Sequence, residues 1–187
     1  MCGIVGIYSE SHVASSIYES LLMLQHRGQD AAGMVVCEAE GILHSRKSMG
    51  YVRDVFRQTH MDKLMGNYGI GHVRYPTSGG AGKEFAQPMY VNSPYGISLA
   101  HNGNLTNSKS LARELFHAEM RHLNTDSDSE VLLNILAHEL GKQRAILPSK
   151  KHFFQAVRKT HVRCNGAYAV VALITGFGLL AFRDPKG

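Results

Sequence analysis

Seven short segments carry apolar and β-branched side chains in the alternating or continuous runs that are typical of β-strands. They cover residues 2–8, 32–37, 42–47, 68–75, 96–101, 167–174 and 178–182. Gly41 marks a turn between the second and third segments. The Asn102-Gly103 dipeptide after the fifth predicts another turn, because Asn-Gly is the strongest short turn signal. Strands joined by such short turns pair antiparallel.

Four other segments have the apolar spacing of amphipathic helices. The first covers residues 13–26, and Gly28 is expected to end it. The second starts at Ser108, the third follows a capping box at residues 127–130 (Ser-Asp-Ser-Glu), and the fourth follows Pro148-Ser149. The apolar side chains expected on the packed faces are Ile17, Leu21, Leu24, Leu111, Leu115, Met120, Val131, Ile135, Leu136, Phe153, Phe154 and Val157.

The order of these elements predicts an α+β fold. Strands come first, central helices follow, and strands return at the end, so grouped helices are expected to cover the faces of antiparallel sheets. Two sheets between helix layers satisfy this order. We expect one domain over residues 1–182, with residues 183–187 beginning a linker to further polypeptide.

Composition agrees with a folded protein of a reducing compartment. The chain has 187 residues, 44% hydrophobic and 19% charged, which excludes wholesale disorder. Its three cysteines are an odd number at no metal-binding spacing, which argues against a disulfide framework and against a metal site. There is no apolar run of membrane-spanning length and no secretory leader, so we expect a cytoplasmic protein without a membrane partner.

The positive charge is concentrated in one segment. The formal net charge is +5, and residues 142–163 hold seven cations and no acid. Such a segment can bind nucleic acid, or it can be a solvated helix face or a surface that docks a partner domain. We favour the second interpretation and expect no nucleic-acid partner, because no turn motif precedes a base-reading helix.

Cys2 is the residue with the clearest chemistry. If Met1 is removed, as is usual before a small second residue, the thiol and the free α-amine belong to one residue. An α-amine has an ordinary pKa of about 7.7–8.0, so it can act as the base for its own thiol near neutral pH. The alternative is that Cys2 is a small buried hydrophobe, the usual fate of a free cysteine.

Five motifs in order carry a resemblance over nearly the whole chain. They are residues 1–6 (Met-Cys-Gly-Ile-Val-Gly), 24–33 (Leu-Gln-His-Arg-Gly-Gln-Asp-Ala-Ala-Gly), 69–77 (Gly-Ile-Gly-His-Val-Arg-Tyr-Pro-Thr), 100–105 (Ala-His-Asn-Gly-Asn-Leu) and 127–130 (Ser-Asp-Ser-Glu). Together they resemble the class II glutamine amidotransferases, which are N-terminal nucleophile hydrolases. The resemblance implies a four-layer αββα sandwich of two antiparallel sheets between helix layers.

The sequence of residues 26–30 (His-Arg-Gly-Gln-Asp) is most similar to that of one branch of the family. Members of this branch join the glutaminase domain to a C-terminal phosphoribosyltransferase domain, which binds phosphoribosyl pyrophosphate with Mg²⁺ and is expected to be absent from this chain. The resemblance implies no cofactor in the chain itself, a homo-oligomeric complete enzyme, and the kind without a propeptide. The alternative is another branch, such as glucosamine-6-phosphate synthase, which usually reads Tyr-Arg-Gly-Tyr-Asp there; asparagine synthetase usually reads His-Arg-Gly-Pro-Asp.

The resemblance also implies roles for individual residues. Cys2 is the nucleophile, and the Asn102 side chain and Gly103 N–H stabilise the negative oxygen of the tetrahedral intermediate. Arg74 binds the α-carboxylate of glutamine and Asp128 its α-ammonium group. The resemblance further places Arg27 and Thr77 in the wall of the pocket.

Each of these assignments has a plainer alternative. Asn102-Gly103 can be an ordinary turn, Asp128 can serve only the helix terminus, and Arg27-Gly28 can be a helix end. At the level of function, the alternatives are a fragment that binds glutamine without turnover and a nucleic-acid-binding module. Cys37, Cys164 and the basic segment receive no functional assignment.

Overall fold

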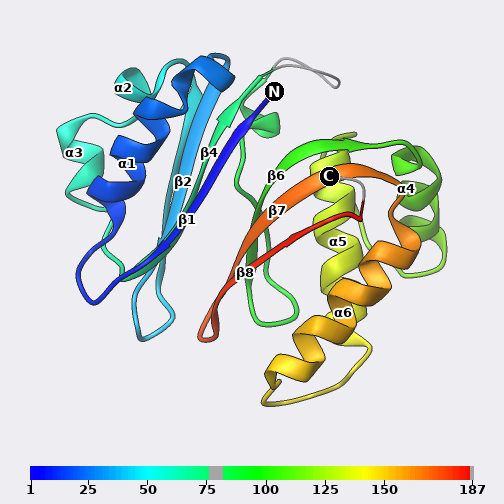
Figure 1. The fold of residues 1–187 in the computed structure, drawn as a ribbon. Helices are drawn as coiled ribbons and strands as arrows, with labels where there is room; N and C mark the ends of the chain where they lie inside the picture. Colours follow the sequence, from blue (N-terminus) through cyan, green and yellow to red (C-terminus); the bar gives the residue numbers. More distant parts are fainter. Residues whose placement is uncertain (76–81, 186–187) are drawn as a thin grey trace.

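The computed structural model describes residues 1–75 and 82–185, and these form two facing four-stranded sheets enclosed by helices (Figure 1). The first sheet has the order β1-β4-β2-β3, and the second has the order β5-β6-β7-β8. Every described strand pair is antiparallel, as predicted. The strands are β1 (Gly3–Tyr8), β2 (Ala31–Cys37), β3 (Leu43–Met49), β4 (Tyr68–Arg74), β5 (Met89–Val91), β6 (Ile97–Leu105), β7 (Gly166–Ile174) and β8 (Gly178–Arg183).

The helices divide between the outer faces of the two sheets (Figure 1). On the first sheet lie α1 (Ala14–Met23), α2 (Val52–Val55) and α3 (Gln58–Met61). On the second lie α4 (Ser108–His117), α5 (Asp128–Gly141) and α6 (Lys150–Arg163). Two short 3₁₀ helices, η1 (Gln25–Arg27) and η2 (Lys83–Phe85), complete the set.

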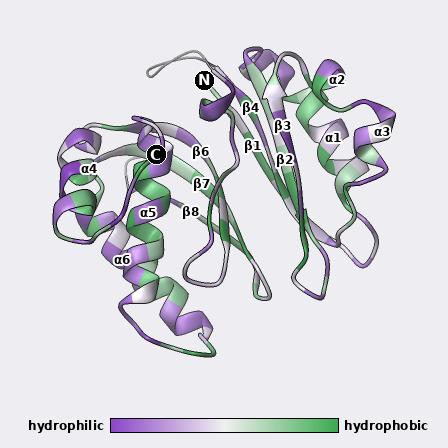
Figure 2. Cartoon of the chain, turned by 180° about the vertical axis from the view of Figure 1, so that it is seen from behind, coloured by the Kyte–Doolittle hydropathy of each residue, from purple (hydrophilic) through white to green (hydrophobic). Residues whose placement is uncertain are grey.

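Three apolar layers hold the four structural layers together. One buried cluster joins α1 and α2 to the first sheet, and a second, larger cluster joins α4, α5 and α6 to the second sheet. The third lies between the sheets and contains Val35, Ile70, Ala100 and Leu173. Figure 2 shows the green, hydrophobic residues gathered on the strands and on the inner helix faces. The predicted α+β class and the αββα arrangement are confirmed.

The prediction of a turn at Asn102-Gly103 is wrong. Both residues lie inside β6, where Asn102 pairs with Ala169 and Gly103 with Tyr168 of β7. The pairing with β7 continues to Leu105, so tertiary pairing overrides the local turn preference. Gly103 is still required as glycine, because its φ is +149° and an added Cβ would lie 2.2 Å from the Ala167 carbonyl oxygen.

Two details of the predicted helices also differ. Ser127 caps α5 by accepting a hydrogen bond from the Ser129 N–H, but Glu130 does not complete the capping box. Its carboxylate instead accepts the N–H groups of Asn124 and Thr125, both at 2.8 Å. Met120 is 92% exposed rather than inward, because α4 ends at His117.

Several short elements were not predicted, and Phe154, which was predicted to lie on a packed helix face, is exposed. The missed elements are β5, α2, α3 and the two 3₁₀ helices, all of them four residues or shorter. Phe154 of α6 is 65% exposed, whereas Val157 on the same helix is buried. No helix among the described residues is long and apolar enough to cross a membrane.

The basic segment is partly neutralised inside the domain. Arg163, at the end of α6, binds the carboxylates of Glu119 and Glu139 at 2.7 Å and that of Glu114 at 3.0 Å. Lys142 lies 3.7 Å from Glu139. These ion pairs join α4, α5 and α6, so two of the segment's seven cations serve helix packing.

Candidate active site

Cys2 directly precedes β1, at the end of the first sheet where Figure 1 marks the amino terminus. The antiparallel pairing of β1 with β4 brings it beside Tyr75, whose N–H donates to Cys2 Sγ at 3.4 Å. The thiol in turn points to the Tyr75 carbonyl oxygen at 3.7 Å. Cys2 is only partly buried, so the interpretation of a small core hydrophobe does not describe it.

The other two cysteines have the environment of structural thiols. Cys37 and Cys164 are both buried. Burial raises the pKa of Cys37, and it raises the pKa of Cys164 to about 12. Because the thiolate is the reactive form, neither is suited to act as a nucleophile.

Four of the predicted site residues line one cavity: Cys2, Arg74, Gly103 and Asp128. They come from both sheets and from the start of α5, so the fold brings together residues far apart in the sequence. Arg27 joins them indirectly, since its Nε donates to the Cys2 carbonyl oxygen at 3.1 Å. Asn102 is adjacent to Gly103 in β6 but does not line this cavity. Thr77 lies outside the described residues.

The backbone of β6 provides a hydrogen-bond donor in this cavity. Two hydrogen bonds continue the β6–β7 ladder beyond its ends: the Thr106 N–H donates to the Asn165 carbonyl oxygen, and the Thr175 N–H donates to the Gly96 carbonyl oxygen. Given the register of the two strands, the even-numbered residues of β6 direct their N–H groups towards β7. The odd-numbered residues therefore direct their N–H groups to the opposite edge. There β5 covers β6 only up to Leu99.

Beyond Leu99, side chains replace the missing strand at that edge. The His101 N–H donates to Gln87 Oε1 at 2.7 Å, and the Leu105 N–H donates to Asp128 Oδ2 at 3.0 Å. Gly103 lies between them, and no acceptor among the described residues binds its N–H. A free backbone donor in a cavity that also contains Cys2 is suited to bind a developing oxyanion.

The cavity also contains charges of both signs. The Arg74 guanidinium binds Asp30 through Nη1 and Oδ2 at 2.6 Å and lies over the Phe85 ring at 5.3 Å. Asp128 occupies the first turn of α5, where the helix dipole favours a carboxylate. One cation and one anion in the same cavity complement a zwitterionic amino acid.

Sequence reasoning missed the buried polar residues behind this cavity. His101 Nδ1 lies 2.9 Å from Ser129 Oγ and 3.8 Å from Asp128 Oδ1. From the facing sheet, His72 Nε2 donates to the His101 carbonyl oxygen at 3.2 Å. Asp30 and His101 lie within motifs 24–33 and 100–105, so the sequence offered a signal for these two residues. Gln87 lies outside all five motifs, and nothing in the sequence pattern assigned it to the site.

His72 makes the stability of the fold sensitive to acid. Complete burial lowers the pKa of His72 to about 3, so the folded state keeps it neutral. The unfolded chain protonates it below about pH 6.5, so the free energy of unfolding falls as pH drops from 6.5 towards 3, by about 1.4 kcal/mol per pH unit. Burial also lowers the pKa of His101, although Asp128 opposes this, and that effect acts in the same direction.

We therefore expect about 2 kcal/mol of stability to be lost at pH 5 relative to pH 7 through His72. Urea unfolding at both pH values measures this loss. The His72→Gln variant should show a smaller pH dependence, whereas His26→Gln, at an exposed position, should not. Equal pH dependence in His72→Gln and the unsubstituted chain would contradict the assignment.

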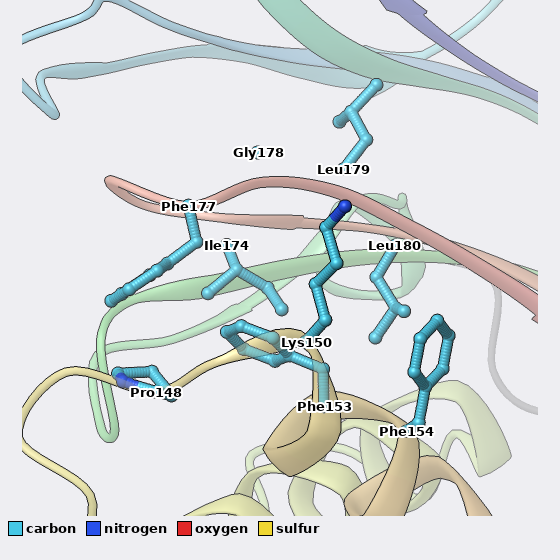
Figure 3. A pocket seen from close by; sticks show the side chains of 9 residues that line it. All are labelled: Pro148, Lys150, Phe153, Phe154, Ile174, Phe177, Gly178, Leu179 and Leu180. Atoms are coloured by element: carbon cyan, nitrogen blue, oxygen red, sulfur yellow. The ribbon is translucent and has the colours of Figure 1, made fainter.

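A second cavity, of about 390 Å³, lies between the β7–β8 hairpin and the start of α6 (Figure 3). Its walls are mainly apolar, including Phe153, Phe177 and Leu180, and the Lys150 side chain extends among them. None of the predicted site residues lines it, so it is separate from the cavity that contains Cys2.

Comparison with known proteins agrees with this geometry. A family model described as a glutamine amidotransferase domain matches residues 81–187, more than half of the chain. The chain belongs to the glutamine amidotransferase domain family. The assignment from the five motifs is thereby confirmed at the level of the family.

The amidotransferase domain is also similar to named proteins. It is 58% identical to an amidophosphoribosyltransferase of Pseudomonas aeruginosa and 54% identical to one of Escherichia coli, matching 100% of this chain and 37% of each relative. The structure of glutamine phosphoribosylpyrophosphate amidotransferase from B. subtilis, complexed with ADP and GMP, matches with a TM-score of 0.82 at 30% identity, over 100% of this chain and 38% of that one. The chain thus spans just over a third of the length of these relatives.

Proposed function

We propose that this chain is the glutaminase domain of an amidophosphoribosyltransferase. The observation that carries the proposal is the convergence of Cys2, the free Gly103 N–H, Arg74 and Asp128 on one cavity. The high identity to amidophosphoribosyltransferases supports this branch of the family over glucosamine-6-phosphate synthase.

In this proposal Met1 is removed and Cys2 becomes the amino terminus. Met1 is 72% exposed, so its removal is not hindered by packing. Cys2 Sγ attacks the side-chain amide carbon of glutamine, and the α-amine takes the thiol proton and passes it to the leaving ammonia. The Gly103 N–H stabilises the oxyanion, and the motif resemblance adds the Asn102 amide as a second donor, although Asn102 does not line the cavity. Water then hydrolyses the glutamyl thioester to release glutamate.

The wider function extends to parts of the protein that this chain does not contain. Ammonia from the cavity would convert phosphoribosyl pyrophosphate to 5-phosphoribosylamine, the first committed step of purine synthesis, in a C-terminal phosphoribosyltransferase domain that binds Mg²⁺. We propose that the glutaminase domain, predicted over residues 1–182, extends to Asp184, because Arg183 ends β8 and the Asp184 N–H donates to the Tyr168 carbonyl oxygen at 3.0 Å. The connection to the C-terminal domain would then begin after Asp184 rather than at residue 183. We further propose that the complete enzyme is a homo-oligomer and is located in the cytoplasm. No group of three metal-ligating side chains occurs in the described part of the chain, and the proposal assigns Mg²⁺ to the C-terminal domain.

Removal of Met1 is tested by intact mass together with a glutaminase assay. We expect the mass of the purified chain to lack one methionine residue and the protein to release glutamate from glutamine. An alanine inserted between Met1 and Cys2 keeps the thiol but moves the free amine one residue away, and it should abolish turnover. Full activity of the insertion variant would contradict the role of the amine. Saturable glutamine binding without turnover by the unsubstituted chain would favour the non-catalytic fragment.

Asp128→Asn should weaken glutamine binding more than it slows the chemistry. The variant keeps an oxygen for the Leu105 N–H but loses the charge that faces the ammonium group. Hydrogen bonds to charged groups contribute about 1.5–3 kcal/mol, so the KM for glutamine should rise about 10- to 100-fold. Asp62→Asn is the control, because Asp62 binds Gln58 on the exposed helix α3. A KM unchanged in Asp128→Asn would remove Asp128 from the substrate site.

A further inference from the structure

We propose that Gln87 is a positioning residue that sets the geometry between the Gly103 donor and the Asp128 carboxylate. The inference rests on the proposed glutaminase function and deepens it. Gln87 lies in the segment between η2 and β5, it is 6% exposed, and it lines the same cavity as Cys2.

The Gln87 side chain joins two elements that carry the chemistry. Its Oε1 accepts the His101 N–H of β6 at 2.7 Å, and its Nε2 donates to Ser129 Oγ of α5 at 3.0 Å. A primary amide is the side chain that accepts at one atom and donates at the other, so it can satisfy both buried partners at once. Leaving the His101 N–H unpaired in a buried site is costly, and Ser129 Oγ would keep only its contacts with His101 Nδ1 and Asp128 Oδ1.

The two anchor points are adjacent to the functional groups. His101 is two residues before Gly103 on the same edge of β6, and Ser129 directly follows Asp128. Ser129 Oγ lies 3.5 Å from Asp128 Oδ1, while Asp128 Oδ2 binds the Leu105 N–H. Gln87, β6, Asp128 and Ser129 therefore form a closed hydrogen-bonded frame around the Gly103 N–H.

The backbone of Gln87 is itself held by the facing sheet. Lys47 Nζ of β3 donates to the carbonyl oxygens of Ala86 and Pro88, at 2.8 and 3.1 Å. Gly33 of β2 packs so closely that an added Cβ would lie 1.9 Å from the Gln87 carbonyl oxygen. The first sheet thus fixes the backbone of Gln87. The Gln87 side chain in turn positions β6, which carries the Gly103 donor, and the start of α5, which carries Asp128.

Gln87→Met tests the proposal, because it removes both hydrogen bonds at similar volume. We expect a lower kcat, since the His101 N–H of β6 loses its acceptor, and a higher KM for glutamine, since Ser129 of α5 loses its hydrogen bond to Gln87. Together these changes should lower kcat/KM about 100-fold or more. The rate is expressed per active site, and the active sites are counted by titration with the diazoketone 6-diazo-5-oxo-L-norleucine. A fall that disappears when activity is counted per titrated site would mean partial unfolding and would overturn the proposal.

Ser129→Ala separates the two effects, and it also tests the proposal if Gln87→Met does not fold. It removes the α5 end of the bridge, together with the Ser129 Oγ contacts to His101 Nδ1 and Asp128 Oδ1, and it leaves Gln87 bound to the His101 N–H. KM should therefore rise about 10-fold while kcat stays within about threefold. A merely structural bridge would not divide the two constants in this way, and an unchanged KM would overturn the proposal.

Gln143→Met is the matched control. Gln143 is partly buried, and its Nε2 donates to the backbone carbonyl oxygen of His152 at 2.8 Å. It lies beyond the far end of the 14-residue helix α5, about 20 Å from Asp128. It should change kcat and KM less than about twofold. If the unsubstituted chain releases no glutamate, the proposed function fails, whereas an active chain with an unchanged Gln87→Met variant contradicts only the role of Gln87.

Discussion

Replacing Cys2 by alanine is expected to abolish glutamine hydrolysis by this chain. The variant retains the Gly103 donor and the charged groups of the cavity but has no atom that can form the thioester. Loss of a nucleophile typically lowers kcat by about 10⁴-fold or more. The release of glutamate, followed with and without the substitution, measures this directly.

Cys164→Ala is the control for the loss of a sulfur atom. Cys164 is buried at the end of α6 and does not line the cavity, so the variant should be somewhat less stable but active. Mass spectrometry of a quenched reaction should find a glutamyl adduct on Cys2. Turnover in Cys2→Ala, or glutamate release without any adduct in the unsubstituted chain, would refute the mechanism.

The second large effect is expected for Gly103→Ala. A Cβ at this position would meet the Ala167 carbonyl oxygen at 2.2 Å and the Tyr168 Cα at 2.6 Å, so β6 must move away from β7. The movement displaces the Gly103 N–H, which we propose binds the oxyanion. Loss of one such donor typically lowers kcat by about 10²- to 10³-fold, with a smaller effect on KM.

Gly178→Ala is a matched control for backbone strain. Gly178 also has a positive φ, +117°, but no atom lies within 4 Å of its Cβ position. The variant should lose about 1 kcal/mol of stability and keep its kcat. If Gly103→Ala keeps the activity of the unsubstituted chain, the Gly103 N–H is not part of an oxyanion site.

Most strands and long helices could be predicted, because their signals are local. The alternation of Cys2 to Tyr8 and the apolar spacing of Ile17, Leu21 and Leu24 indicate strand and helix without knowledge of any neighbour. The short elements β5, α2 and α3 carry too few residues for a periodic signal. Met120 was misassigned because α4 stops before the apolar pattern does.

The site was only partly predictable. Motif resemblance supplied Cys2, Arg74, Gly103 and Asp128, and the structure places all four at one cavity. It did not supply Gln87 or its partner Ser129, because the role of each depends on a contact across 42 residues of chain. The pairing of Arg74 with Asp30, across 44 residues, is likewise invisible in the sequence pattern.

The sequence by itself determined most of the strands and long helices, and it supplied the side chains that we propose bear the chemistry. Both properties depend on residue type and on spacings of a few positions, and the motif resemblance depends on residue identity alone. Only the tertiary structure decided that Asn102-Gly103 continues a strand and that the Gly103 N–H, between two occupied neighbours, has no acceptor among residues 1–75 and 82–185. These are outcomes of strand pairing and of long-range hydrogen bonds, in which a distant partner competes with, and outweighs, the local preference of the chain.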